Sequence, residues 1–180
     1  MDLNLAPKNW RNLIKPKGLE VERDSLTDTY GRFAAKPLER GFGVTIGNSL
    51  RRILLSSLQG VAVTAVRIEG VLHEFSTIPD VVEDVTDVIL NLKEIRFKLY
   101  GDGPKTVNID KKGPGIVTAA DIQVDDSVEV LNPTQPICTI GKDGRFRAEL
   151  RLEFGKGYMA SESMKRDDLP AGVIPVDAFF

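Results

Sequence analysis

The chain has 180 residues, of which 42% are hydrophobic and 28% charged, and its formal net charge at pH 7 is −2. A chain of this size and composition can bury a core in one large or two small domains, so disorder is not the default expectation. The charge balance also argues against a dedicated nucleic-acid binder, which carries a net basic charge or a strong basic stripe.

Cellular location is inferred from the cysteine content and from the apolar segments. The chain has one cysteine, Cys138, which forms no intrachain disulfide and fits a reducing compartment. No apolar run approaches the ~18 residues that span a bilayer, and residues 1–18 lack the apolar core of a secretory signal. We therefore expect a cytoplasmic protein without membrane association.

The first third of the chain predicts an arm, a hairpin and a helix. Residues 1–18 are polar and contain two prolines, which indicates an irregular arm. Residues 19–36 alternate apolar and polar side chains on either side of turn-forming residues, the pattern of strand, turn and strand. A glycine-containing turn then leads into an amphipathic helix from Thr45 to about Leu58.

The remaining residues predict strands and one more helix. Residues 61–75 are rich in β-branched side chains and predict one or two strands. Apolar residues then recur at helical spacing up to Ile95, with Pro79 at the expected helix start. Short strands separated by glycine and proline turns follow from residue 96.

The segment 145–154, RFRAELRLEF, is the clearest strand because apolar and charged residues alternate strictly along it. Residues 155–172 are rich in glycine and charge and predict a loop. Residues 173–180, VIPVDAFF, begin another apolar strand at which the chain stops, so we expect a C-terminally truncated chain.

Few residues in the chain are suited to metal binding or nucleophilic catalysis. One histidine and one cysteine cannot build a Cys/His zinc site, and we expect His73 to be a partly buried strand residue. Glu83, Asp84 and Asp87 are expected to offset the dipole of a helix rather than to act as an acid/base pair. We therefore expect no catalytic residue, metal site or cofactor in this chain.

The glycines at positions 41, 43 and 47 have the spacing G-x-G-x-x-x-G. This is neither the dinucleotide-binding fingerprint nor a Walker A loop, which requires Gly-Lys-Ser or Gly-Lys-Thr. The spacing therefore favours a tight turn before the helix rather than a phosphate-binding loop.

The helix that follows has two distinct faces when residues are placed ~100° apart. One face is apolar and predicts a core or dimer contact; it contains Ile46, Leu50, Ile53, Leu54 and Leu58. The opposite face contains Asn48, Arg51, Arg52 and Leu55. A solvated basic face with one exposed leucine and a protein-binding patch both fit this second set, and the residues alone leave the two open.

The segment LERGFGVTIGNSLRRILLSSLQGVAVTAVRIEGVLHEFSTIPDVVEDVTDVILNLK, residues 38–93, closely resembles the N-terminal domain of bacterial DNA-directed RNA polymerase alpha subunits. The resemblance continues in GPGIVTAADI, GKGYMASES and IPVDAFF and so covers most of the chain. It implies an α+β fold. Residues 1–59 and 173–180 would form a dimerisation and assembly domain, incomplete at its C-terminus, and residues 60–172 an inserted, mainly β domain.

The resemblance also implies a set of contacts. Arg52 and Leu55 match family positions that contact the beta subunit, and Lys93, Val176 and Asp177 match others that contact beta or beta-prime. The apolar face of the helix would form the homodimer interface through Ile46, Leu50, Ile53 and Leu54.

The implied function is that of a non-catalytic subunit of a nucleotidyltransferase complex. Two copies would pair and assemble beta and beta-prime, with omega and sigma in the holoenzyme and the catalytic magnesium on the partner subunits. Family members continue into a C-terminal domain that reads DNA, so we expect no direct promoter contact by this chain. The alternatives are a freestanding nucleic-acid-binding module using Arg40, Arg51 and Arg52, and an enzyme built around His73.

Overall fold

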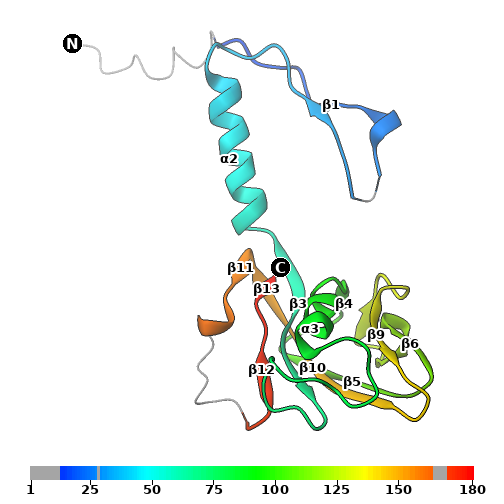
Figure 1. The fold of residues 1–180 in the computed structure, drawn as a ribbon. Helices are drawn as coiled ribbons and strands as arrows, with labels where there is room; N and C mark the ends of the chain where they lie inside the picture. Colours follow the sequence, from blue (N-terminus) through cyan, green and yellow to red (C-terminus); the bar gives the residue numbers. More distant parts are fainter. Residues whose placement is uncertain (1–12, 28, 164–169) are drawn as a thin grey trace. The chain divides into compact units, whose positions relative to one another are not determined.

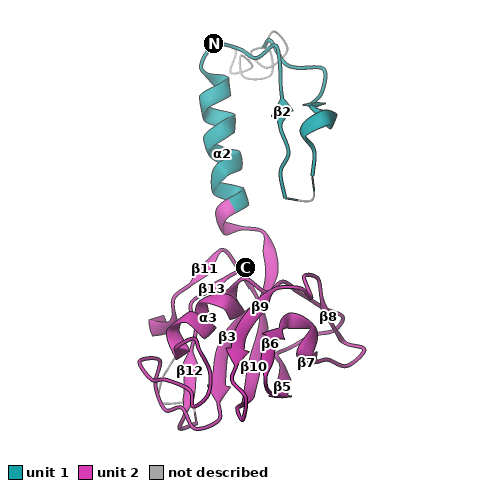
Figure 2. Ribbon diagram, turned by 45° about the vertical axis from the view of Figure 1, so that its right-hand side comes forward, with its two compact units in different colours: residues 1–54 teal, residues 55–180 magenta. Residues whose placement is uncertain are grey.

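The computed structural model describes residues 13–27, 29–163 and 170–180. The chain divides into two compact units, here called the N-terminal unit (1–54) and the C-terminal unit (55–180) (Figure 2). The described residues form two α-helices and a larger number of strands, which confirms the predicted α+β class. Neither helix is long and apolar enough to cross a membrane, as far as the described residues go.

The N-terminal unit contains a short hairpin and the first helix. Strand β1 (Glu20–Val21) pairs antiparallel with β2 (Phe33–Ala34), and a 3-10 turn, η1 (Arg23–Ser25), lies between them. This hairpin confirms the strand, turn and strand predicted for residues 19–36. The irregular arm predicted for residues 1–18 lies largely outside the described residues.

Helix α2 (Phe42–Ser56) begins three residues before the predicted Thr45. Gly41 precedes it with φ of +89°, a backbone conformation that glycine adopts without steric cost, so the tight turn is made by Gly41 alone. The prediction was wrong for Gly43, which lies within the helix, as does Gly47. Each glycine there costs about 1 kcal/mol relative to alanine, so α2 is intrinsically weak.

The C-terminal unit is built on a five-stranded antiparallel sheet in the order β12–β3–β10–β5–β7 (Figure 1). Its central strand, β10, pairs with β3 on one side and β5 on the other. The strands are β3 (Gln59–Ile68), β5 (Lys105–Lys112), β7 (Ile122–Gln123), β10 (Arg145–Lys156) and β12 (Val173–Pro175).

Strand β10 confirms the alternation predicted from the sequence. Four of its apolar residues lie in the core, namely Phe146, Ala148, Leu150 and Leu152. Phe154 has the same parity but is 39% exposed, beyond the point where the register with β3 shifts.

Three two-stranded sheets and two 3-10 turns complete the C-terminal unit. The pairs are β4 (Phe97–Leu99) with β8 (Val128–Val130), β6 (Gly115–Thr118) with β9 (Pro136–Ile140), and β11 (Tyr158–Met159) with β13 (Ala178–Phe179). The turns are η2 (Ala119–Asp121) and η3 (Ser161–Ser163).

Helix α3 (Val85–Lys93) packs against the sheet through Val85, Val88 and Leu92, none of which is accessible to solvent. The carboxylate of Asp84 caps the helix by accepting the N–H of Asp87 at 2.8 Å. The predicted start at Pro79 was wrong. Residues 80–82 instead hydrogen-bond through their backbone to residues 139–141, which holds them out of the helix.

His73 lies in an exposed bend, so the prediction that it is a partly buried strand residue was wrong. Strand β3 ends at Ile68, and Gly70, with φ of +79°, turns the chain away from the sheet. The Ser76 hydroxyl lies 3.2 Å from Nδ1 of His73, so the imidazole has a local polar contact rather than a core position.

The last strands belong to the C-terminal unit. Strand β12 pairs with β3, and β13 pairs with β11. The grouping of residues 173–180 with residues 1–59 in an assembly domain stays a prediction. The chain end lies against β3 at Gly60, where an added Cβ would be 2.7 Å from the carbonyl carbon of Phe180.

We predict that Gly60→Ala lowers the free energy of unfolding of the C-terminal unit by about 1–3 kcal/mol, because the new methyl group overlaps the Phe180 backbone. Urea unfolding followed by circular dichroism measures the change. Gly101→Ala is the matched control, since nothing lies within 4 Å of an added Cβ there. Equal stability of the two variants would contradict the close approach of the chain end to β3.

Candidate partner-binding surfaces

The apolar face of α2 is uncovered. None of the fifteen residues of this helix, all of which the structure describes, is buried. The predicted dimer contacts Ile46, Leu50, Ile53 and Leu54 are 39%, 51%, 50% and 61% exposed. A helix of this length is marginal in water unless its apolar face packs, so α2 gains stability when this face is covered.

The opposite face of α2 combines apolar and basic groups. Leu55 is 63% exposed, and Arg51 and Arg52 are exposed in the preceding turn. An apolar side chain flanked by guanidinium groups is typical of protein-binding hot spots. The arrangement fits the predicted beta contact by Arg52 and Leu55, which stays a prediction.

A second candidate surface lies at the C-terminal end of α3, where Lys93 and Asp177 approach each other. Nζ of Lys93 lies 5.3 Å from the centroid of the Phe179 ring, and Oδ1 of Asp177 accepts the N–H of Ser161 at 2.7 Å. The Ser161 N–H is the main cause of the lowered pKa of Asp177, and the charge of Lys93 adds to it. Two predicted partner contacts from distant parts of the chain are thus brought together.

Val176 differs from these residues because its side chain is in the core. It is 2% exposed, and its N–H donates to the carbonyl oxygen of Thr64 at 2.8 Å. The described position gives Val176 a structural role in fixing the neighbouring Asp177, whereas a direct contact with a large subunit remains a prediction.

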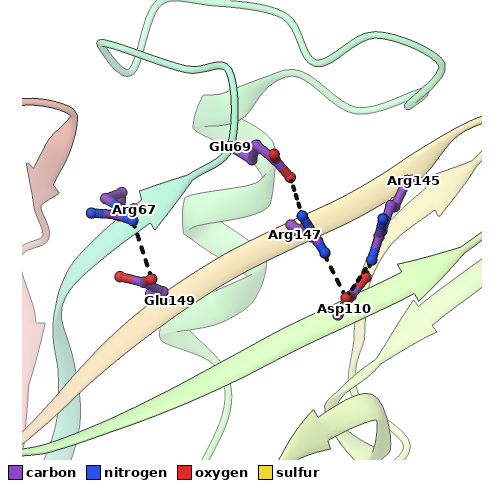
Figure 3. A network of polar contacts seen from close by, with 6 residues as sticks. All are labelled: Arg67, Glu69, Asp110, Arg145, Arg147 and Glu149. Carbon is purple, nitrogen blue, oxygen red and sulfur yellow. Dashed lines mark hydrogen bonds and ion pairs between the residues drawn. The ribbon is translucent and has the colours of Figure 1, made fainter.

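A network of charged residues covers part of the five-stranded sheet (Figure 3). Arg67 pairs with Glu149 at 3.2 Å, and Asp110 accepts two hydrogen bonds from Arg145, at 2.7 and 2.6 Å. Arg147 lies between Asp110 and Glu69, at 3.2 and 3.4 Å. The arginines are neutralised by neighbouring carboxylates, so the network is better suited to holding strands together than to binding phosphates.

The single cysteine has no feature of a reactive thiol. Cys138 is 1% exposed, and burial is the main reason that its pKa is raised to about 12. Within the described ranges, no group of three or more His, Cys, Asp and Glu residues is arranged to hold a metal ion.

Residues 66–180 match the model of the RNA polymerase Rpb3/RpoA insert domain. The chain belongs to this family. It is 55% identical over 173 residues to the DNA-directed RNA polymerase subunit alpha of Geobacter metallireducens and 53% identical over 173 residues to that of Pelobacter propionicus. Each match covers 96% of this chain and 51% of the relative, so the chain spans about half the length of these curated relatives.

Sequence analysis missed Tyr158, Ser161 and Phe179 as members of the second candidate surface. The first two lie in a segment that was predicted to be a loop, and Phe179 was predicted only as part of an apolar strand. The pairing of β11 with β13, two strands of two residues each, brings them to Asp177. No local sequence pattern indicates such a short pairing.

We predict that acid weakens the C-terminal unit through Asp110. Hydrogen bonding to Arg145 is the main cause that lowers the pKa of Asp110 from 3.8 to about 2. A carboxyl with a lowered pKa stabilises the fold above its unfolded-state pKa, and this contribution is lost between about pH 4 and pH 2. Thermal unfolding across this pH range should show a smaller acid dependence in Asp110→Asn.

The control for this experiment is Asp143→Asn, in the turn before β10, which should keep the acid dependence of the parent chain. An unchanged acid dependence in Asp110→Asn would show that the network does not couple protonation to folding.

Proposed function

We propose that this chain acts as a DNA-directed RNA polymerase alpha subunit, which homodimerises and assembles beta and beta-prime in the cytoplasm. It contributes no catalytic residue, and the catalytic magnesium belongs to the large subunits. Omega and sigma complete the holoenzyme. Family membership and the names of the relatives support this proposal.

The observation that carries the proposal is the uncovered apolar face of α2. An assembly subunit needs such a face, because its partner is another chain. The four residues of this face lose their water contact when a second copy packs on them, and apolar burial yields roughly 25 cal/mol per Å². A second copy is therefore the occupant that we assign to this face.

The large subunits are assigned to the other contacts. Arg52 and Leu55 bind beta from the opposite face of α2, while Lys93 and Asp177 bind a large subunit from the C-terminal unit. Val176 supports Asp177 from the core. The freestanding nucleic-acid module of Arg40, Arg51 and Arg52 gains no support from the relatives, and its steep salt dependence would distinguish it.

We predict that Ile53→Asp abolishes self-association. The substitution places a carboxylate on the apolar face, and desolvating an unpaired charge should raise the dimer dissociation constant by at least about 100-fold. Sedimentation velocity over a range of concentrations measures the change. Asn48→Asp adds the same charge to the opposite face of α2 and should leave the dimer intact. A native dimer of Ile53→Asp would refute the assignment of this face.

We also predict that Arg52→Ala weakens binding to purified beta subunit by about tenfold or more, as expected for an interface arginine. Size-exclusion co-elution and a titration at two salt concentrations measure it, with thermal unfolding as the test of folding. Arg51→Ala is the comparison and should have the smaller effect. Equal effects of both substitutions would contradict the specific assignment of Arg52 to the beta contact.

A further inference from the structure

Four side chains from three separate segments meet beside the C-terminal end of α3. Lys93 is the last residue of that helix, and Tyr158 lies in β11. Asp177 lies just before β13, and Phe179 lies within it. Strands β11 and β13 run side by side (Figure 1). Their register places Tyr158 opposite Phe179. The pairing of these two short strands therefore brings Tyr158 beside Phe179 and close to Asp177.

The ring of Phe179 contacts the ammonium group of Lys93. This ring is 68% exposed, so it contributes little to the core, yet it has two specific contacts. Nζ of Lys93 lies 5.3 Å from the ring centroid, within the range of a cation–π interaction. On the strand beside it, the Tyr158 ring lies 4.8 Å away, centroid to centroid, at an interplanar angle of 41°. The tyrosine thus fixes the ring that in turn orients the ammonium group.

Tyr158 also acts on the carboxylate. Its phenol lies close enough to the Asp177 carboxylate to help lower the pKa of that carboxyl, and Oδ1 of Asp177 accepts the Ser161 N–H at 2.7 Å. A carboxylate that accepts a backbone N–H and lies beside a phenol has less rotational freedom to lose when a partner binds. Tyr158 is itself 55% exposed, so this position is open to a partner and is not part of the buried core.

We propose that Tyr158 and Phe179 are positioning residues, which hold Asp177 and Lys93 in the orientation that a large polymerase subunit binds. This inference rests on the proposed function, which assigns Lys93 and Asp177 to that contact. Preorganisation strengthens binding because less side-chain freedom is lost when the complex forms. The two aromatic residues therefore act through the charged pair, and their effects depend on its presence.

The chain contains a matched control for this chemistry. In the β4–β8 region, Nζ of Lys98 lies 4.7 Å from the centroid of the Tyr100 ring, and the Tyr100 hydroxyl bonds to the carboxylate of Glu129. Lysine, aromatic ring and carboxylate recur there without any predicted partner contact. Tyr100→Phe therefore removes a phenol from beside a carboxylate, as Tyr158→Phe does, at a site that the proposal does not involve.

The test measures binding of an equimolar mixture of purified beta and beta-prime subunits to the immobilised full chain. Tyr158→Phe removes the phenol and keeps the ring, and it should weaken binding about threefold to tenfold. Phe179→Leu removes the aromatic face and keeps an apolar side chain, and it should weaken binding about twofold to fivefold. Tyr100→Phe should change neither binding nor thermal stability.

Double substitutions separate positioning from general stabilisation. Tyr158→Phe should have no further effect in an Asp177→Asn chain, and Phe179→Leu none in a Lys93→Met chain. The thermal unfolding midpoints of the aromatic variants should equal that of the parent chain. The positioning role would be overturned if the affinity losses of the two substitutions in each double variant were independent of each other. It would also be overturned if both single aromatic variants kept the affinity of the parent.

The same experiment distinguishes failure of the underlying function. If Lys93→Met and Asp177→Asn bind as tightly as the parent chain, the contact assigned to Lys93 and Asp177 is wrong, and the positioning role is refuted as well. If those two variants lose affinity and the aromatic variants do not, the contact stands and only the positioning role is refuted.

Discussion

The unburied apolar face of α2 is the constraint on which the proposed assembly depends. A fifteen-residue helix with two internal glycines has little stability of its own, and the described chain buries none of its residues. The free energy that keeps such a helix ordered must come from another surface. Dimerisation and helix formation are therefore one equilibrium in this proposal, because the second copy supplies that surface.

The C-terminal unit has the opposite character, because its core is complete within one chain. Strand β10 pairs along both edges, α3 covers buried residues of the sheet, and the final strands close against β3 and β11. Such a unit can present Lys93 and Asp177 on a rigid support. In the proposed assembly, one unit thus supplies an interface that forms only with a partner, and the other supplies an interface that is already formed.

The sequence predicted elements whose residues follow a simple period. The alternation of apolar and charged residues predicted β10, and the helical spacing of apolar residues predicted α2. The start of α3 was missed because residues 80–82 pair with residues 139–141, a contact that no local period reveals. His73 was misplaced because the turn at Gly70 ends β3 early. Only part of the cluster around Asp177 could be predicted. The family resemblance indicated Lys93 and Asp177, but the positions of the aromatic residues depend on the long-range pairing of β11 with β13.

The burial of Cys138 has a practical consequence for work on assembly. It is the only cysteine of the chain, and its thiol is both inaccessible and protonated at neutral pH. Maleimide reagents should therefore leave the native chain unmodified. A cysteine introduced at an exposed position would be the single labelling site, so fluorescent probes can report on partner binding without first removing the natural thiol.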